Sequence, residues 1–364
     1  MTAESTGRQL IGFNEGATWD TAVALTGGVG VHGRVSYSIS RNEFRTIDVG
    51  FGLKVFDMTK LDVDVGVRFN CDLFFGSHAT QLIAMILGSG LVAAETTASQ
   101  GDYPHTFDFE EVNDGLFTTL TASYGSRTTD VIEFPSVKWN RLKLTLNNNQ
   151  IAQLEAEGVA SRMVITGTVN DRDDLEALTY AETSDSDDRY VAVGSANDYF
   201  RINDASGAAL DSTHNFEILT LEYEINRPMQ SIKPLRGANS RYTIEPVQLD
   251  PATETLTIQF AEIDTSKYDF LAKWAADTRQ KAELYVAGSQ IGTGVRRSFR
   301  IQWPKLSWPG ELPSGVDLPN NNTLMQPTVV LRPLSATAAP SGMTGVTDTR
   351  IVAVNGRATA YLTP

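Results

Sequence analysis

The stretch that decides the fold occurs twice in the chain. It reads IEFPSVKW from Ile132 to Trp139 and IQWPKLSW from Ile301 to Trp308. The isoleucine, aromatic, proline, aliphatic and tryptophan positions are in step at a shift of 169 residues. Because proline removes a donor from a strand ladder, it belongs at an edge or a bulge. We therefore expect each occurrence to lie in a strand that is not central to its sheet.

Three further matches accompany this one. They are YSISR at Tyr37 with YEINR at Tyr223, shifted by 186; the expected helix caps Ser77 and Asp264, shifted by 187; and RYVAVGSANDYF at Arg189 with RIVAVNGRATAY at Arg350, shifted by 161. In chain order the shifts run 186, 187, 169 and 161, as one unit copied once would give after losing loop residues from the second copy. We predict two tandem units, residues 1–212 and 213–364, with a loop near residues 89–115 holding the extra residues of the first.

Alternating side chains predict a fold made mainly of strands. Residues 62–73 read DVDVGVRFNCDL, and six apolar side chains fall on one face, which is typical of a half-buried strand. Cys71 is on that face, so we expect a small buried hydrophobe rather than a reactive thiol. Most of the remaining chain consists of short alternating runs separated by Gly, Asn, Asp and Pro. Such sheets must fold over or close to bury their apolar faces, so we expect two related β-sandwich or barrel units.

Each unit also carries one short flanking helix in this interpretation. The first is capped by Ser77, has apolar residues at helical spacing and ends at Gly88. The second is capped by Asp264 or Thr265. On one stripe of this helix lie Lys267, Phe270, Leu271 and Trp274.

Length and charge exclude several classes of protein. The chain has 364 residues, enough for two or three domains, and its one cysteine excludes a disulfide framework. A net charge of −14 argues against a basic face that grips phosphates. The sequence starts without a signal-like segment, and its longest helical apolar run, Leu82 to Leu87, falls far short of the roughly 20 residues of a membrane span. We expect a soluble protein that is made in the cytoplasm.

The charge is unevenly divided between the two predicted units. Residues 1–212 carry 15 basic and 30 acidic residues, whereas residues 213–364 carry 15 and 14. Contacts between unlike units are therefore favoured over contacts between two acidic units. This difference suits an alternating arrangement of units around a ring.

No motif in the sequence predicts catalysis, a cofactor or a metal ion. The glycines Gly28, Gly30 and Gly33 satisfy G-x-G-x-x-G, but a strand pattern follows them instead of the helix that a dinucleotide site needs. The histidines lack metal-ligand spacing; they are His32, His78, His105 and His214. The acidic runs at 171–176 and 185–188 lack the glycine and final glutamate of a calcium loop. A carbohydrate-binding or hydrolysing β-sandwich remains an alternative, since carboxylates are abundant.

Several of these stretches resemble one family. The opening LIGFNEGATWDTAV, with Glu15, the Thr18–Trp19 pair and Thr21, is similar to the start of the tail tube proteins, or major tail proteins, of long-tailed bacteriophages, although Asp20 stands where that pattern has glycine. The PHTF stretch from Pro104 and the later RSFRIQWPKLSWPG also resemble that family.

The resemblance implies a structural subunit that forms rings, which stack into a tube for genome ejection. Six units per ring are usual there, so a chain of two units implies three chains per ring. Its partners would be its own copies, the tape measure, terminator and distal tail proteins, and DNA in transit without specific binding, in a virion tail assembled in the host cytoplasm and without a membrane. Another ring-forming tail protein, a distal tail or terminator protein, is a second alternative.

Two stretches are expected to contact the next ring, by the same resemblance. They are a long loop at 44–56 and its counterpart at 228–242; the alternative is that both are ordinary surface hairpins. The candidate contact residues are Phe44, Asp48, Phe51, Lys54, Phe56, Pro228, Lys233, Arg236 and Arg241.

Acidic side chains are expected on the wall of the channel, because DNA carries about one charge per 1.7 Å and a basic wall would hold it. The candidates, which the sequence also allows to face outward, are Asp171, Asp173, Asp174, Glu176, Asp185, Asp187 and Asp188. Near the carboxy terminus, Asn355-Gly356 predicts a final hairpin.

Overall fold

The computed structural model describes residues 9–29, 34–48, 54–76, 79–92, 94–96, 100–178, 191–192, 196–233, 242–261, 268–310 and 326–362; at 28–29, 41–48 and 54–62 it describes the backbone alone. The strands are β1 (Ile11–Glu15), β2 (Gly27–Val29), β3 (Arg34–Asp48), β4 (Lys54–Asp72), β5 (Leu91–Val92), β6 (Tyr103–Asp108), β7 (Thr118–Ser123), β8 (Val131–Asn147), β9 (Gln153–Ala160), β10 (Val164–Ile165), β11 (Tyr199–Asp204), β12 (Asn215–Phe216), β13 (Ile218–Asn226), β14 (Met229–Gln230), β15 (Val247–Gln248), β16 (Thr253–Phe260), β17 (Gln280–Gly292), β18 (Val295–Ser307), β19 (Thr328–Pro333) and β20 (Arg350–Asn355). The helices are α1 (Thr80–Leu87), α2 (Arg172–Ala177) and α3 (Phe270–Ala275), and a 3₁₀ turn spans Ser212–His214.

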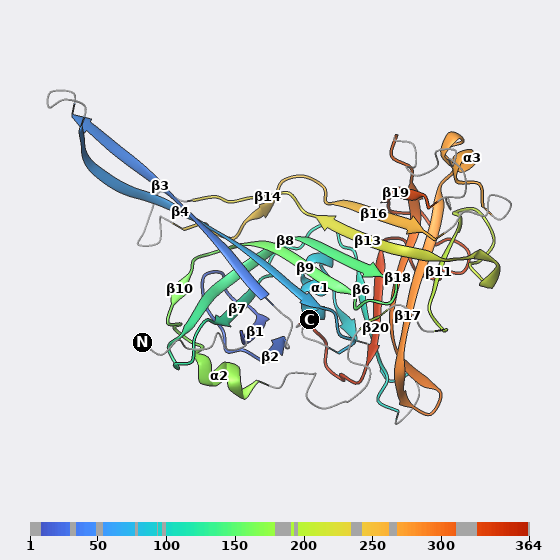
Figure 1. Cartoon of the computed structure of the whole chain (residues 1–364), viewed down its shortest axis with the longest axis horizontal. Helices are drawn as coiled ribbons and strands as arrows, with labels where there is room; N and C mark the ends of the chain where they lie inside the picture. The colour runs from blue at the N-terminus through green and yellow to red at the C-terminus, as the bar shows by residue number, and fades with distance from the viewer. Residues whose placement is uncertain are drawn as a thin grey trace.

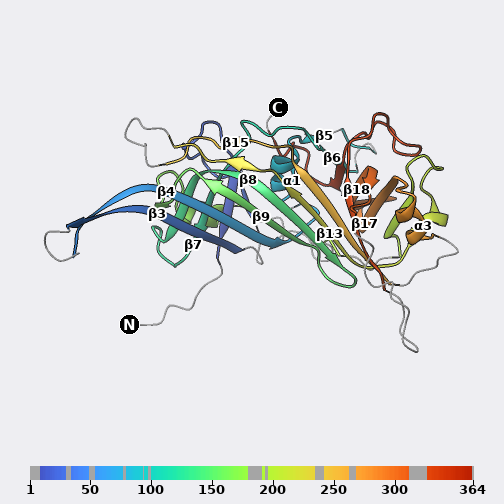
Figure 2. The ribbon, with the colours of Figure 1, turned by 90° about the horizontal axis from the view of Figure 1, so that it is seen from above.

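The fold is mainly β, as expected, and the strand pairings between these elements are antiparallel. One layer runs through both parts of the chain in the order β3–β4–β9–β8–β13–β16–β19. Figures 1 and 2 show these strands along the length of the molecule, and the β3–β4 hairpin projects from one end. The remaining strands continue from β8 and from β18, apart from the separate ribbon of β14 and β15.

The strand pairings of the first half of the chain, β1–β10, recur in the second half, β11–β20. β1 pairs with β2 and β7, β7 with β8, β8 with β9 and β10, and β4 with β3 and β9. Likewise β11 pairs with β12 and β17, β17 with β18, β18 with β19 and β20, and β16 with β13 and β19.

The registers of these pairings agree as well. Across β1, β7 and β8 the register partners are Ile11, Ala122 and Ile132, and across β11, β17 and β18 they are Phe200, Leu284 and Ile301. Across β3, β4 and β9 they are Tyr37, Val67 and Gly158, and across β13, β16 and β19 they are Tyr223, Leu256 and Leu331. The sequence matches at Ile132 and Tyr37 therefore coincide with matched positions in the hydrogen-bond ladders.

The proline stretches are central strands, so the prediction for them was wrong in part. β8 has neighbours on both sides, β7, β9, β10 and β13, and β18 pairs with β17, β19 and β20. Both prolines coincide with register shifts: Pro135 lies between Phe134 and Val137, and Pro304 between Trp303 and Leu306. The extra residue of a bulge makes no ladder hydrogen bond. A proline there removes no needed donor, so a central strand tolerates it. Each bulge separates the part of the strand that pairs with β10 or β20 from the part that pairs with β9 or β19.

The core lies on one side of the long layer. Along β4 the side chains of Val65, Val67, Phe69 and Cys71 are buried, which confirms the expectation for the cysteine. α1, whose eight residues are all buried, contacts β8 and β6. Such burial explains why residues 82–87 are apolar on every side of the helix instead of along one stripe.

The helices differ from the prediction at their starts. α1 ends as expected, with Gly88 in the left-handed region at φ 98°, but it begins after Ala79 without a side-chain cap, and Ser77 lies outside the described residues. α3 begins at Phe270, where Asp269 accepts a hydrogen bond from the Ala272 amide at 2.9 Å. The predicted cap at Asp264 or Thr265 is wrong because the chain at Asp269 is still extended; residues 262–267 lie outside the described part.

The expected loop at 89–115 contains strands. β5 and β6 lie in it, and β6 pairs with β20 of the other half. The expected hairpin at Asn355-Gly356 is also wrong, because no strand follows β20 in the described residues 356–362. The Asn355 side chain instead donates to the Phe75 carbonyl at 2.7 Å and accepts from the Arg357 amide.

The match at Arg189 does not recur in the pairings. Of its described residues, Val191 and Ala192 lie beside Leu73, Ile151 and Ala152, whereas Tyr199 and Phe200 belong to β11. β20 pairs with β18 where β10 pairs with β8, so β10 is the counterpart of β20.

Candidate assembly surfaces

The side of the long layer opposite α1 is polar. Side chains along its strands alternate between buried and partly exposed. Glu155 and Glu157 of β9, Arg141 and Lys143 of β8, and Glu222 and Glu224 of β13 share the partly exposed side, with Arg68 of β4. Thr255, Thr257 and Gln259 of β16 continue it. We call this surface the polar face.

The charges of the polar face form a ladder of ion pairs across four strands. Arg141 lies between Glu224 on one side, at 2.7 Å, and Glu155 and Glu157 on the other, at 3.3 and 3.0 Å. Arg68 binds Glu155 at 2.6 Å and Lys143 binds Glu222 at 3.0 Å. Hydrogen bonds to Glu224 raise the pKa of the Arg141 guanidinium, and a hydrogen bond to Glu155 raises that of Arg68. Both therefore stay charged, and four carboxylates face three cations.

The acids that the sequence analysis singled out lie elsewhere. Asp171, Asp173, Asp174 and Glu176 belong to α2 and its cap, and α2 contacts β7 instead of the polar face. The Asp171 side chain accepts from the Asp174 amide, and that of Asp174 accepts from the Asp171 amide. Glu176 pairs with Arg172 at 2.7 Å. Asp185, Asp187 and Asp188 lie outside the described residues.

The sequence contained one signal for α2 and one for the polar face. The Asp-x-x-Asp spacing at 171–174 is a helix N-terminal pattern, and the alternation of charged with apolar residues in RLKLTL and LEYEIN marks a half-polar sheet. Pairing between these strands is long-range, so the spacing alone did not bring their charges together.

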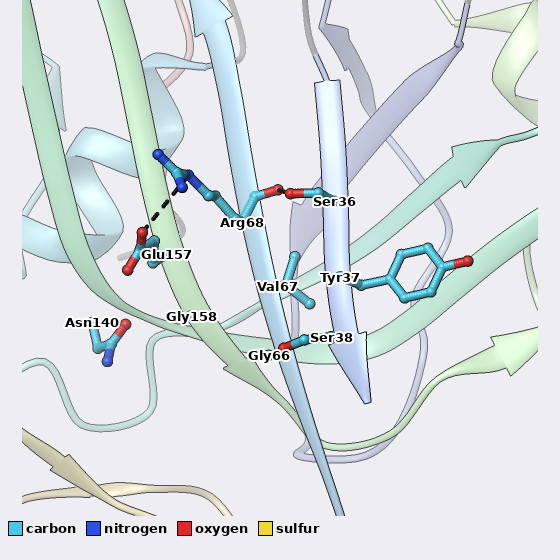
Figure 3. Close-up of a pocket in the computed structure, with 9 residues that line it drawn as sticks. All are labelled: Ser36, Tyr37, Ser38, Gly66, Val67, Arg68, Asn140, Glu157 and Gly158. Carbon is cyan, nitrogen blue, oxygen red and sulfur yellow. Dashed lines mark hydrogen bonds and ion pairs between the residues drawn. The ribbon is translucent and has the colours of Figure 1, made fainter. Parts of the chain in front are cut away.

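A shallow groove of about 380 Å³ lies where β3, β4, β8 and β9 meet (Figure 3). It is lined by Ser36, Tyr37, Ser38, Gly66, Val67, Arg68, Asn140, Glu157 and Gly158. In Figure 3 the Arg68 and Glu157 side chains approach each other on one side, and the Tyr37 ring points away from them. A Cβ at Gly66 would approach Ser38 Oγ to 2.8 Å, so the missing side chain keeps the groove open.

The expected loop at 44–56 is instead a long β-hairpin, which we call the arm. β3 and β4 stay paired out to Asp48 and Lys54, whereas β4 pairs with β9 only from Val65 onward. The arm therefore extends away from the body (Figure 1). Phe44 and Phe56 lie on its two strands, as do Asp48 and Lys54, and Phe51 lies outside the described residues.

The counterpart stretch at 228–242 belongs to a short ribbon, residues 228–233 and 242–249. The Pro228 carbonyl accepts from the Leu249 amide at 3.0 Å, and β14 pairs with β15. Lys233 forms an ion pair with Asp64 of β4 at 2.7 Å, at the base of the arm. Arg236 and Arg241 lie outside the described residues.

Ionisable groups elsewhere have structural partners. His105 is buried, its Nε2 lies 2.9 Å from the Arg357 carbonyl, and burial lowers its pKa. His214 contacts Asp211 at 2.9 Å in a turn. His32 and His78 lie outside the described residues, within which no group of three or more His, Cys, Asp or Glu could hold a metal ion. Among the helices that the structure describes, none is long and apolar enough to span a bilayer.

A scan against models of known protein families and a search of curated proteins found no match to this chain.

Proposed function

We propose that the chain is the structural subunit of a bacteriophage tail tube, polymerising as stacked rings into a conduit for genome ejection. The observation that carries the proposal is the layer in which two halves with matching pairings lie side by side, joined by β8 and β13 and sharing one polar face. A ring of such halves would turn one continuous polar surface toward its hole.

The matched registers support an internal duplication. Two halves that share seven strand pairings among eight strands each would be improbable without a common ancestor. Because β11 and β12 correspond to β1 and β2, the boundary between the copies then precedes Tyr199 and lies before the position expected from the sequence. Two units per chain and six per ring give three chains per ring.

The polar face supplies a wall suited to passing DNA. Its cations are paired with carboxylates, so few are free to bind phosphate. The wall that we propose is thus lined by Glu155, Glu157, Glu222 and Glu224 and not by the acids of α2. Screening limits such repulsion to about 8 Å at physiological salt, so only these inward side chains would act.

The proposal assigns ring-to-ring contact to the arm. Before Val65 the strands of the arm pair with each other and with no other described strand, and an open strand edge is a template for pairing with another chain. Ile232, Ile244, Val247 and Leu249 on the ribbon are also partly exposed and offer a second apolar contact.

Negative-stain microscopy combined with solution mass at rising concentration tests the proposal. Long hollow tubes are expected, with threefold rings. Single rings would instead indicate a distal tail or terminator protein, and a monomer that binds glycan would favour the β-sandwich alternative. Rings of six chains would overturn the trimer. In the tubes, Glu155→Lys with Glu224→Lys should increase retention of duplex DNA at low salt, whereas Glu176→Lys on α2 should not.

A further inference from the structure

The two halves differ on the side of their outer strands that faces away from the core. In the second half, β11, β17 and β18 lie side by side at the end of the molecule away from the arm (Figure 1). Phe200, Leu284 and Ile301 point from these strands into the core, so the residues next to them point to the opposite side. We call that opposite side the arginine face, because it carries Arg201, Arg296 and Arg300.

The same side of the first half is covered by α2 and by the chain just before it. A Cβ added at Gly12 of β1 would approach the Leu178 side chain to 2.6 Å and that of Leu175 to 3.0 Å. Glu133 of β8 is 0% exposed, and its carboxylate accepts hydrogen bonds from the amides of residues 168–170. The first half thus buries this side of its sheet.

The matched positions of the second half carry longer and partly exposed side chains. In the registers given above, the positions of Gly12, Ser123 and Val131 are taken by Arg201, Tyr285 and Arg300. Ser123 and Val131 are 2% and 0% exposed, whereas Tyr285 and Arg300 are each partly exposed. The side of the sheet that α2 covers in the first half is therefore open at these positions in the second half.

Stacking orders the arginines of this face. The Tyr199 and Tyr285 rings stack with their centroids 5.2 Å apart and an interplanar angle of 15°. The Arg201 guanidinium lies over the Tyr199 ring at 3.7 Å, and that of Arg300 lies over the Tyr285 ring at 5.3 Å. A stacked guanidinium keeps its N–H donors at its edge, where they can bind a carboxylate in a fork.

The three arginines of the face form no ion pair with any residue that the structure describes. Arg201 donates to the neutral Asn215 side chain at 2.7 Å. Glu283 is the register partner of Arg201, but its carboxylate accepts from Tyr199 and Gln302 instead, both at 2.7 Å. A chain with a net charge of −14 therefore carries a local cationic surface here.

The occupied tyrosine rings narrow the class of partner. Single-stranded nucleic acids bind by stacking their bases on open aromatic faces. Both rings of the arginine face already carry a planar group, so they offer no such platform. A carboxylate needs only the edge of a guanidinium. Charge complementarity therefore favours a partner with several carboxylates.

We propose that the arginine face is a docking site for an acidic segment of a partner protein, whose Asp and Glu carboxylates bind Arg201 and Arg300. Phe200 and Phe260 pack in the core between this sheet and the long layer, so the arginine face and the polar face point in opposite directions. The site would stay accessible in a ring whose hole is lined by the polar face. The inference goes beyond the proposed function and does not depend on it.

The experiment is fluorescence anisotropy of a fluorescein-labelled deca-glutamate peptide titrated with the full-length chain at low salt. Arg201→Gln with Arg300→Gln should bind the peptide about tenfold more weakly, because two guanidinium forks are lost. Arg127→Gln with Arg332→Gln is the matched control, since it removes the same charge from two exposed arginines outside the face. The control should bind as tightly as the unmodified chain.

A charge-preserving variant separates the fork from the charge alone. Arg201→Lys with Arg300→Lys keeps both cations and folds under the same constraints, but a lysine cannot bind a carboxylate in a fork. It should bind the peptide more weakly than the unmodified chain and more tightly than the glutamine variant. Binding equal to that of the unmodified chain would overturn the role of the stacked guanidiniums.

The remaining outcomes separate this inference from its alternatives and from the proposed function. Equal weakening in the glutamine variant and its control, or no binding by the unmodified chain, would overturn the site. Tighter binding of a sulfated glycan or an oligothymidylate would overturn the acidic protein segment as the partner. Tubes lost in the glutamine variant would assign the face to contacts between copies, overturning the inference and keeping the tube. Specific binding by a chain that never forms tubes would do the reverse.

Discussion

The arm and the ribbon occupy the same place in the two halves: the arm connects β3 to β4, and the ribbon connects β13 to β16. Beyond Val63 the described arm strands pair with each other alone. The ribbon, in contrast, is tied to the first half. Trp19 Nε1 donates to the Thr243 carbonyl at 3.0 Å, and Lys138 binds Glu245 at 2.7 Å. Among the described residues, the same connection is thus tied down in the second half and extended in the first, a contrast that agrees with the ring-to-ring contact that we propose for the arm.

Removing each connection in turn tests this contrast most strongly. Replacing residues 42–62 by an Asn-Gly turn joins the register partners Arg41 and Val63. We expect stacked tubes to be lost, while the free energy of unfolding of the monomer changes by less than about 0.5 kcal/mol.

The matched control replaces residues 230–247 by the same turn between Met229 and Gln248. It should destabilise the monomer by roughly 2–4 kcal/mol, because the buried Lys138 ammonium loses its carboxylate. Urea denaturation and microscopy measure the two effects. Equal destabilisation by both replacements would remove the distinction between arm and ribbon.

Substitution of Arg227 is expected to give the next largest loss of stability. Its buried guanidinium donates to the Ile86 carbonyl at 2.7 Å and the Glu110 carbonyl at 2.6 Å, at the end of α1. Burial lowers its pKa to about 10, so it is charged at neutral pH. Arg227→Ala should cost roughly 3–5 kcal/mol of unfolding free energy.

Calorimetry of the monomer measures this loss. A monomer that keeps its stability in Arg227→Ala would contradict the structural role of the buried guanidinium.

Glu254 gives a pH-dependent difference between the halves. Its side chain accepts hydrogen bonds from Tyr223 and Thr349, whereas Val65 holds the matching place in β4. Burial raises the pKa of Glu254 above its ordinary value of 4.5. Between pH 4.5 and the raised pKa, the folded chain holds a proton on Glu254 that the unfolded chain has lost. The free energy of unfolding therefore declines as the pH rises toward the folded pKa, by at most about 1.4 kcal/mol per pH unit.

Glu254→Gln should therefore flatten the dependence of unfolding free energy on pH. Denaturant titrations of the monomer at several pH values from 4 to 8 measure it. Glu176→Gln, at an exposed carboxylate of α2, is the matched control. An unaltered slope in Glu254→Gln would contradict the assignment of the proton to this group.

The smallest effects are expected on the polar face. Arg141 contacts three carboxylates, so Arg141→Gln should cost about 1 kcal/mol, less at high salt. Arg68→Gln, at a side chain that is 55% exposed, should leave stability unchanged. Thermal denaturation at two salt concentrations compares them. A larger loss of stability in Arg68→Gln than in Arg141→Gln would mean that the ion pairs of β4 stabilise the polar face more than those of β8.

Much of the local structure could be predicted from the sequence. The strand at 62–73, the burial of Cys71 and the end of α1 at Gly88 follow from alternation and from glycine's access to positive φ. The start of α3 could not be located, because several acidic and hydroxyl side chains near it can cap a helix and packing around Tyr268 and Phe270 selects Asp269. The α2 helix was missed because one buried residue, Leu175, leaves almost no periodicity.

By itself the sequence determined the β-rich class, the alternating faces and the recurrence at Tyr37 and Ile132, because each depends on residues close together in the chain. Tertiary structure alone decided that Pro135 lies in a central strand, that β6 crosses to β20, and which charges meet on the polar face. These features depend on strand partners far apart in the chain. The energy of strand pairing depends on the register and on the neighbouring side chains, and a local sequence pattern contains neither.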